Sequence, residues 1–340
     1  MKHSNISIFI PHIGCPHKCS FCDQRTISGA QHAPSGKEVS EICAKALGEI
    51  ESPENSEIAF FGGSFTAVPR DYMLELLEAA KPFIGNGKFR GIRISTRPDC
   101  IDREILDLLK SYGVTAIELG AQSMSDHVLA MNGRGHSADD VRKACELIRE
   151  YGFELGLQIM LGLYGSTPDD DFETIWSVML IHPDTVRIYP VVILKGTKLA
   201  ELYESGEYQT YPFDEAVELA VTALLWYKNA GIEVIKCGLH ASEFVEKDMI
   251  GGFYHPAFRE ICESIIYREE ISSVIGNIRG FLPMRNPERD ELFEFAVTPS
   301  CISKAIGHKK SNIEYFRENG IELKIVGDEN VPEYKVELRR

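Results

Sequence analysis

The chain alternates short apolar segments with longer stretches in which apolar residues recur every three or four positions. Short apolar and β-branched segments predict buried strands, and the longer period predicts amphipathic helices. The expected strands are residues 6–10, 57–61, 91–95, 114–119, 153–161, 185–191 and 232–236. The expected helices between them are residues 38–51, 71–83, 103–113, 139–152 and 213–231.

This alternation of strands and helices predicts βαβ units and a parallel sheet. Six or seven repeats exceed the needs of a small doubly wound sheet, so they favour a full or partial barrel. The alternation stops near residue 250. We therefore expect a barrel over residues 1–250 and a smaller α+β domain over residues 251–340, with a connecting loop at 251–258 and a helix at 259–271.

Composition narrows the class of protein. The 340 residues are 44% hydrophobic and carry a formal net charge of −15, which argues against a protein that coats nucleic acid non-specifically but permits a local basic patch. The nine cysteines are an odd number and mostly scattered, unlike a disulfide framework. No apolar segment approaches the ~20 residues of a membrane span, and the first residues lack a signal-peptide core. We expect a soluble protein of a reducing cytoplasm.

Three cysteines directly follow the first expected strand. Cys15, Cys19 and Cys22 have the spacing C-x3-C-x2-C, which lets a short loop wrap three thiolates around one metal centre. Three ligands would leave one iron of a four-iron cluster open, as a catalytic cluster requires. A structural zinc site that adds His12 or His17 is the alternative. No other cysteine has ligand spacing, so we expect one cluster.

With the aromatic Phe21, this segment resembles the signature of the radical S-adenosylmethionine (SAM) superfamily. The resemblance implies a partial (βα)6-type barrel and a 4Fe–4S cluster held by Cys15, Cys19 and Cys22. It also implies that SAM chelates the open iron, and that an electron from the cluster cleaves SAM to methionine and a 5′-deoxyadenosyl radical. An electron donor is then required, which the sequence does not identify. Phe21 resembles the residue that contacts adenine.

The expected strands end in glycine-rich or polar segments, where barrel enzymes place their sites. The segment after the second strand resembles the Gly-Gly motif that holds the SAM amino group, with serine where many relatives have glutamate. The segment after the third strand resembles one in the catalytic subunit of the Elongator tRNA-modifying complex. The candidate residues are Gly62, Gly63, Ser64, Ser95, Thr96 and Arg97. Simple strand-to-helix turns are the alternative explanation.

Later strand ends supply further candidates for SAM contacts. Gln122 resembles a residue that reaches SAM in coproporphyrinogen-oxidase-like radical SAM enzymes, and Arg134 matches an arginine that pairs with the SAM carboxylate. Gln158 and Tyr189 lie on or at the end of the fifth and sixth strands, and the resemblance places Val191 and Val192 near adenine. Alternatively, Arg134 is a surface residue and the two valines are plain core.

The segment 291–328 has the order strand, helix, loop, helix, strand, and it resembles a KH RNA-binding domain. The loop of that domain clamps nucleotides by their backbone. Here Gly307, His308, Lys309 and Lys310 occupy the loop, and Lys310 replaces its second glycine. The alternative is a small appendage that packs on the barrel or on a partner subunit.

The radical SAM resemblance covers about residues 6–240, and no acetyltransferase-like domain follows. It implies a SAM-cleaving enzyme of the Elongator-like and coproporphyrinogen-oxidase-like branch, with RNA, in particular tRNA, as the leading substrate class. A radical SAM oxidoreductase acting on a small molecule such as a porphyrin precursor is one alternative. A non-catalytic, metal-stabilised RNA-binding protein is the other.

Overall fold

A computed structural model describes residues 4–10, 19–23, 32–281 and 291–339 of the chain. It divides into two compact units. The first consists of Met1–Ala216 and Leu224–Tyr254, and the second of Val217–Ala223 and His255–Arg340. Each unit has a sheet of its own.

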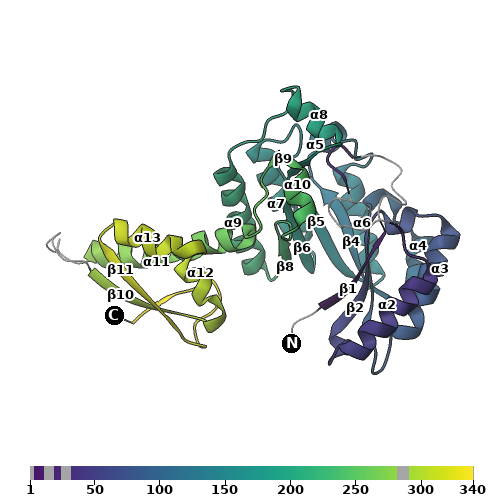
Figure 1. Cartoon of the computed structure of the whole chain (residues 1–340), viewed down its shortest axis with the longest axis horizontal. Coiled ribbons are helices and arrows are strands. Elements are labelled where there is room, and N and C mark those ends of the chain that lie inside the picture. Colours follow the sequence, from purple (N-terminus) through teal and green to yellow (C-terminus); the bar gives the residue numbers. More distant parts are fainter. Residues whose placement is uncertain (1–3, 11–18, 24–31, 282–290, 340) are drawn as a thin grey trace. The chain divides into compact units, whose positions relative to one another are not determined.

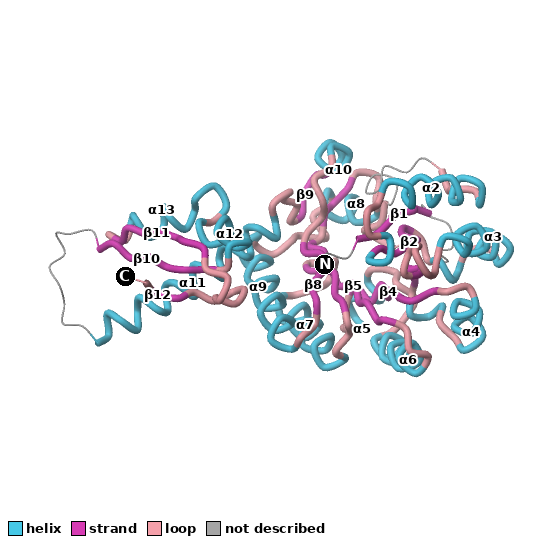
Figure 2. Tube along the Cα trace, turned by 90° about the horizontal axis from the view of Figure 1, so that it is seen from below, coloured by secondary structure: helices cyan, strands magenta, loops and turns pink. Residues whose placement is uncertain are grey.

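The first unit contains a parallel sheet of seven strands in the order β1-β2-β3-β4-β5-β6-β8. The strands are β1 (Ser4–Ile10), β2 (Ser56–Gly62), β3 (Gly91–Thr96), β4 (Val114–Gln122), β5 (Glu154–Leu161), β6 (Thr185–Pro190) and β8 (Glu233–Cys237). Each of these strands pairs with the next one in the sequence, so the strand order runs in one direction across the sheet. Figure 2 shows the curved row of strands with helices outside it. The predicted partial barrel is confirmed.

The helices of this unit begin where the sequence places capping residues. Ser35, Ser137 and Thr167 each accept a hydrogen bond from the backbone three residues on, in capping boxes that satisfy otherwise unpaired N–H groups. The helices are α2 (Gly36–Glu49), α3 (Arg70–Ala80), α4 (Arg103–Ser111), α5 (Asp126–Met131), α6 (Ala138–Glu150), α7 (Pro168–Ile181), α8 (Lys198–Glu204), α10 (Glu243–Asp248) and both ends of α9 (Phe213–Ala230), whose middle residues belong to the second unit. Figure 1 labels them along the chain.

A second, antiparallel pair of strands in this unit was not expected from the sequence. β7 (Val192–Leu194) pairs with β9 (Met249–Gly252), so the expected loop at 251–258 in fact begins within a strand. The backbone of Gly252 has φ +93°, and an added Cβ would lie 2.4 Å from the carbonyl oxygen of Val191. Glycine is therefore required for the two strands to approach. Strands this short show no hydrophobic period that a sequence pattern could reveal.

The second unit has a small three-stranded sheet of order β11-β10-β12. Its elements are α11 (Phe258–Phe281), β10 (Glu291–Val297), α12 (Ile302–Ile306), α13 (Ser311–Glu318), β11 (Ile321–Gly327) and β12 (Glu337–Leu338). β10 and β11 are parallel, and Phe295, Phe316 and Ile321 pack in the core between sheet and helices. The expected order of strand, helix, helix and strand is present. In the part of the chain that the structure describes, no helix is long and apolar enough to cross a membrane.

Candidate cofactor pocket at the carboxyl ends of the strands

The first unit contains a cavity of about 880 Å³, a size typical of ligand pockets. Parallel strands end at the same edge of a sheet, so this edge gathers residues from segments far apart in the sequence. The cavity is lined by most of the residues expected from the sequence: Cys19, Phe21, Cys22, Gly62, Gly63, Ser64, Ser95, Thr96, Arg97, Gln122, Arg134, Gln158 and Tyr189.

Two of the three expected metal ligands are among the described residues. Cys19 is buried and Cys22 is partly exposed, and the N–H of Cys22 donates a hydrogen bond of 3.3 Å to the carbonyl of Cys19. This tight turn directs both cysteines towards the cavity. Cys15, like the alternative zinc ligands His12 and His17, lies outside the described residues.

The glycine-rich end of β2 is packed against β1. Gly62 has φ +109°, and an added Cβ would lie 2.9 Å from the carbonyl oxygen of Ile10. The N–H of Gly63 donates a hydrogen bond of 2.8 Å to that same oxygen. Glycine is therefore needed here for strand packing, independently of any ligand. Ser64, the next residue, is buried in the cavity wall.

The ends of β2 and β3 are joined by hydroxyl groups. Thr96 Oγ1 lies 2.9 Å from Ser64 Oγ and 2.6 Å from Thr66 Oγ1. The N–H of Arg97 donates a hydrogen bond of 3.3 Å to Ser64 Oγ. These bonds hold the two segments together in the cavity wall.

Two arginines in the cavity wall each have a guanidinium nitrogen that makes no hydrogen bond to the described residues. Arg97 donates from Nε and Nη2 to the carboxylate of Asp99, at 2.9 Å each, and Nη2 also donates to the carbonyl of Arg134. Arg134 donates from Nη1 to Cys19 Sγ at 3.1 Å and from Nη2 to the carbonyl of Gly120. Arg97 Nη1 and Arg134 Nε are buried and have no hydrogen-bond partner among the described residues.

Gln122 also has a buried polar atom without a hydrogen-bond partner among the described residues. Its backbone is left-handed, with φ 67°, and its buried Oε1 accepts no hydrogen bond from any described residue. A buried polar atom without a partner costs about 1–3 kcal/mol, so such atoms mark places where a ligand can bind. Side chains that line one cavity thus hold two unused N–H groups and one unused oxygen, which is the chemistry that the carboxylate and the ammonium of an amino acid require.

His136 lies near Arg97 and Arg134 but adds no positive charge to theirs. Burial, followed by the positive charge of Arg134, lowers the pKa of His136 to about 4. Its Nε2 lies 3.3 Å from the carbonyl oxygen of Ala121. The imidazole is therefore neutral near pH 7.

A buried network of charges supports the cavity wall at Ser95, Gln158 and Arg187. Glu118 is 1% exposed and accepts hydrogen bonds from Arg187 Nε at 2.7 Å, Gln158 Nε2 at 2.9 Å and Arg93 Nη1 at 3.3 Å. Gln158 also donates to Ser95 Oγ at 3.2 Å. The attraction between these buried charges offsets part of the cost of removing them from water. Gln158 and Ser95 are thus held in place from within the barrel.

Arg187 is a cavity residue that the sequence did not reveal. It lies on β6 with its guanidinium over the ring of Phe61, 5.1 Å from the ring centroid. The available signal was the alternation along β6, which puts Arg187 and Tyr189 on one face of the strand. A single arginine within an apolar strand gives no sign of its partners, because these lie on other strands.

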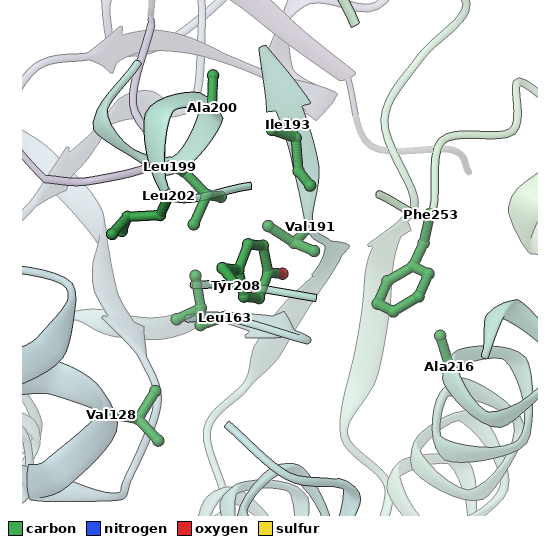
Figure 3. Close-up of a cluster of buried hydrophobic side chains, with 10 residues drawn as sticks. All are labelled: Val128, Leu163, Val191, Ile193, Leu199, Ala200, Leu202, Tyr208, Ala216 and Phe253. Carbon is green, nitrogen blue, oxygen red and sulfur yellow. The ribbon is translucent and has the colours of Figure 1, made fainter. Parts of the chain in front are cut away.

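Val191 is not brought to the cavity. It is fully buried in an apolar cluster with Leu163 and Phe253, as Figure 3 shows. The neighbouring Val192 lines the cavity instead. Successive residues of an extended segment point to opposite sides, so only one of the two valines can face the ligand space.

In the second unit, the loop between α12 and α13 presents two exposed lysines. Lys309 and Lys310 have φ 53° and 65°, which is the left-handed region that favours glycine. Gly307, φ +91°, leaves no room for a Cβ against the start of α13. His308 lies 3.3 Å from the carboxylate of Glu260. Lys310 thus adopts a left-handed backbone conformation that glycine tolerates better than lysine.

Comparisons with known proteins place these features in a family. A model of the radical SAM superfamily matches residues 9–175, and one of the radical SAM C-terminal domain matches residues 183–268. An uncharacterized protein of Methanocaldococcus jannaschii is 32% identical over 61% of this chain and 67% of its own length. A tRNA uridine(34) acetyltransferase of Methanocaldococcus infernus is 30% identical over 60% of this chain, which covers only 46% of that relative.

Among solved structures, an archaeal Elp3 of Methanocaldococcus infernus with an N-terminal deletion has a TM-score of 0.54. The sequences are 20% identical, and the match covers 72% of this chain and 61% of that one. At this identity the likeness concerns the fold, and it agrees with the partial barrel of the first unit.

Proposed function

Because this chain belongs to the radical SAM superfamily, whose members bind a 4Fe–4S cluster and SAM, we propose that it is a radical SAM enzyme that modifies tRNA. The cofactors and the need for an electron donor follow from the family. The substrate, the residues that hold each cofactor and the division of labour between domains are our proposal.

The unused polar atoms in the cavity carry the assignment of the SAM site. Arg97 Nη1 and Arg134 Nε can donate to a carboxylate, and Gln122 Oε1 can accept from an ammonium. All three side chains line the cavity that Cys19 and Cys22 also line. An amino-acid group beside the cysteines would satisfy them all, so the residues fit SAM.

In this assignment Cys15, Cys19 and Cys22 hold the cluster. When bound, the cluster supplies the electron that cleaves SAM to methionine and a 5′-deoxyadenosyl radical. The chain itself binds and orients the cofactors and the substrate, and it excludes water from the site. Phe21 would pack against adenine and the Gly62–Gly63–Ser64 segment would hold the amino group, while Ser95, Thr96, Gln158 and Tyr189 form the remaining wall of the cavity.

Two observations support tRNA as the substrate. A relative that is 30% identical over 60% of this chain is a tRNA uridine(34) acetyltransferase. The second unit also presents Lys309 and Lys310 exposed at a loop between two helices, directly after Gly307 and His308. We assign the cofactor chemistry to residues 1–250 and RNA contact to residues 251–340, in a cytoplasmic enzyme.

The test is anaerobic incubation of the reconstituted protein with SAM, dithionite and total tRNA, followed by mass spectrometry of the nucleosides. We expect a nucleoside mass that is absent when the Cys19→Ala variant replaces the wild type. SAM cleavage without any new nucleoside would favour a small-molecule substrate such as a porphyrin precursor. Binding of tRNA without iron or SAM cleavage would favour a non-catalytic RNA-binding protein.

A further inference from the structure

Ser20, one of the two residues between Cys19 and Cys22, is held by a residue 112 positions further along the chain. Ser20 Oγ donates a hydrogen bond of 2.6 Å to Oδ1 of Asn132, and the N–H of Ser20 donates one of 3.2 Å to the carbonyl of Asn132. The carbonyl of Ser20 accepts a hydrogen bond of 2.8 Å from the N–H of Leu199. Ser20 and Asn132 are both buried.

Asn132 is itself fixed by its remaining side-chain donors. Its Nδ2 donates to the carbonyls of Val128 and Tyr164, at 2.8 Å each. Both N–H groups and the oxygen of this amide are therefore used. The amide ties Ser20 to the end of α5 and to the loop that follows β5.

Two residues further on, Arg134 reaches the sulfur of Cys19. Its Nη1 lies 3.1 Å from Cys19 Sγ, and its Nη2 donates to the carbonyl of Gly120 on β4. Arg134 is 6% exposed. The guanidinium is thus anchored to the barrel at one end and touches a proposed cluster ligand with the other.

A hydrogen bond of this kind affects the two oxidation states of a cluster unequally. Reduction adds one negative charge, so a positively charged donor at a ligand sulfur stabilises the reduced cluster more than the oxidised one. Hydrogen bonds to the sulfurs are among the features that set cluster potentials. Burial strengthens the effect, because little solvent screens the charge.

We propose that Asn132 and Arg134 form one anchor of the cluster loop, in which Asn132 fixes Ser20 and Arg134 raises the reduction potential of the cluster through Cys19. The proposal rests on the assignment of Cys19 as a cluster ligand. It gives Arg134 a role that exists before SAM binds, because the Nη1 contact is to the protein itself. Towards the cluster, both residues act through Cys19 or Ser20 and are therefore positioning residues.

The test is a redox titration of the full chain, reconstituted anaerobically and without SAM, followed by electron paramagnetic resonance. Arg134→Gln removes the charge, and Arg142→Gln is the matched control because Arg142 is exposed on α6. At a fixed solution potential we expect at least a tenfold lower ratio of reduced to oxidised cluster in Arg134→Gln, which is about 59 mV for a one-electron couple. Arg142→Gln should titrate with the wild type.

Arg134→Lys keeps the charge without the planar fork, so its potential should lie between those of Arg134→Gln and the wild type. If Arg134→Gln retains no cluster, the potential of Arg134→Lys is the measurement that tests the proposal. A wild-type potential in whichever of these two variants retains iron would overturn the proposal, and so would loss of iron from both. A wild type without iron would instead overturn the cluster assignment, so the two failures are distinguishable.

The role of Asn132 is tested by the rate at which a chelator removes iron. Ser20→Ala and Asn132→Ala should each accelerate the loss, and the double variant should lose iron no faster than Asn132→Ala alone. Such coupling is expected when two residues act through one contact. Independent, additive effects of the two substitutions, or none, would contradict the anchor.

Discussion

Ser64 follows β2 and Thr96 ends β3, 32 residues apart, and their hydroxyl oxygens are 2.9 Å apart in the wall of the cavity. Both are almost completely buried. The contact joins the glycine-rich end of β2 to the polar end of β3, so these segments form one surface rather than two separate turns.

Thr96→Val tests that surface, because valine keeps the shape and removes the hydroxyl. Ser64 and Thr66 would lose a buried partner, which costs about 1–3 kcal/mol in the free energy of unfolding. We expect a lower melting temperature and weaker SAM binding, measured by calorimetry. Thr222→Val, at a more exposed hydroxyl on α9, is the control and should have little effect. A Thr96→Val protein that melts and binds SAM as the wild type does would show that the hydroxyl contacts do not organise the wall.

Glu118→Gln tests the buried charge network. Removal of this charge leaves Arg93 and Arg187 without a common partner, and breaking a buried pair typically costs about 3–5 kcal/mol. The control is Glu150→Gln, which affects an ion pair with Arg103 at the surface and should cost less than about 1 kcal/mol. Urea unfolding measures both. Equal stabilities of the two variants would mean that the network does not support the barrel.

Asp171 should make stability depend on pH. Burial, only partly offset by hydrogen bonds from Ser166, Tyr211 and Gly162, raises the pKa of this carboxyl to about 6. In the unfolded chain it ionises near pH 4, so between these values the folded state binds more protons. The protonated carboxyl therefore adds to the free energy of unfolding. This contribution is complete below about pH 4 and is lost as the pH rises through about 6, and it is on the order of 3 kcal/mol in total.

Asp171→Asn removes this contribution. The difference in unfolding free energy between wild type and variant should therefore shift against the wild type from pH 5 to pH 7 and then level off. Asp169→Asn, at an exposed carboxylate on the same helix, should show no such trend. A pH-independent difference for Asp171→Asn would place the pKa outside this range.

The regular part of the fold could be predicted because its elements are long and periodic. The strands of the barrel and most of the helices between them follow the predicted segments closely, although α7 (Pro168–Ile181) was not predicted, and the polar strand ends gather as parallel topology requires. Asn132 and Arg187 could not be found this way, since their partners Ser20 and Glu118 lie far away in the sequence. Val191 shows a further limit: the resemblance locates the strand end but not which of two adjacent valines faces the cavity.

The RNA proposal is tested by charge reversal at the exposed loop. Phosphate contacts release counterions, so binding to tRNA should weaken with salt. Lys309→Glu with Lys310→Glu should lower the affinity for tRNA and flatten its salt dependence, while iron content and SAM cleavage without substrate remain. Fluorescence titration at several salt concentrations measures both effects. A double variant that binds as the wild type does would make the second unit a packing or oligomerisation domain.

The most direct test of the account is the conversion of SAM to 5′-deoxyadenosine by the anaerobically reconstituted protein in the presence of dithionite. Liquid chromatography with mass spectrometry should detect 5′-deoxyadenosine and methionine with about four irons per chain. Cys15→Ala, Cys19→Ala and Cys22→Ala should each abolish the product and the brown colour, whereas Cys43→Ala, at a core cysteine on α2, should retain both. A colourless wild type that holds one zinc and leaves SAM intact would contradict the account.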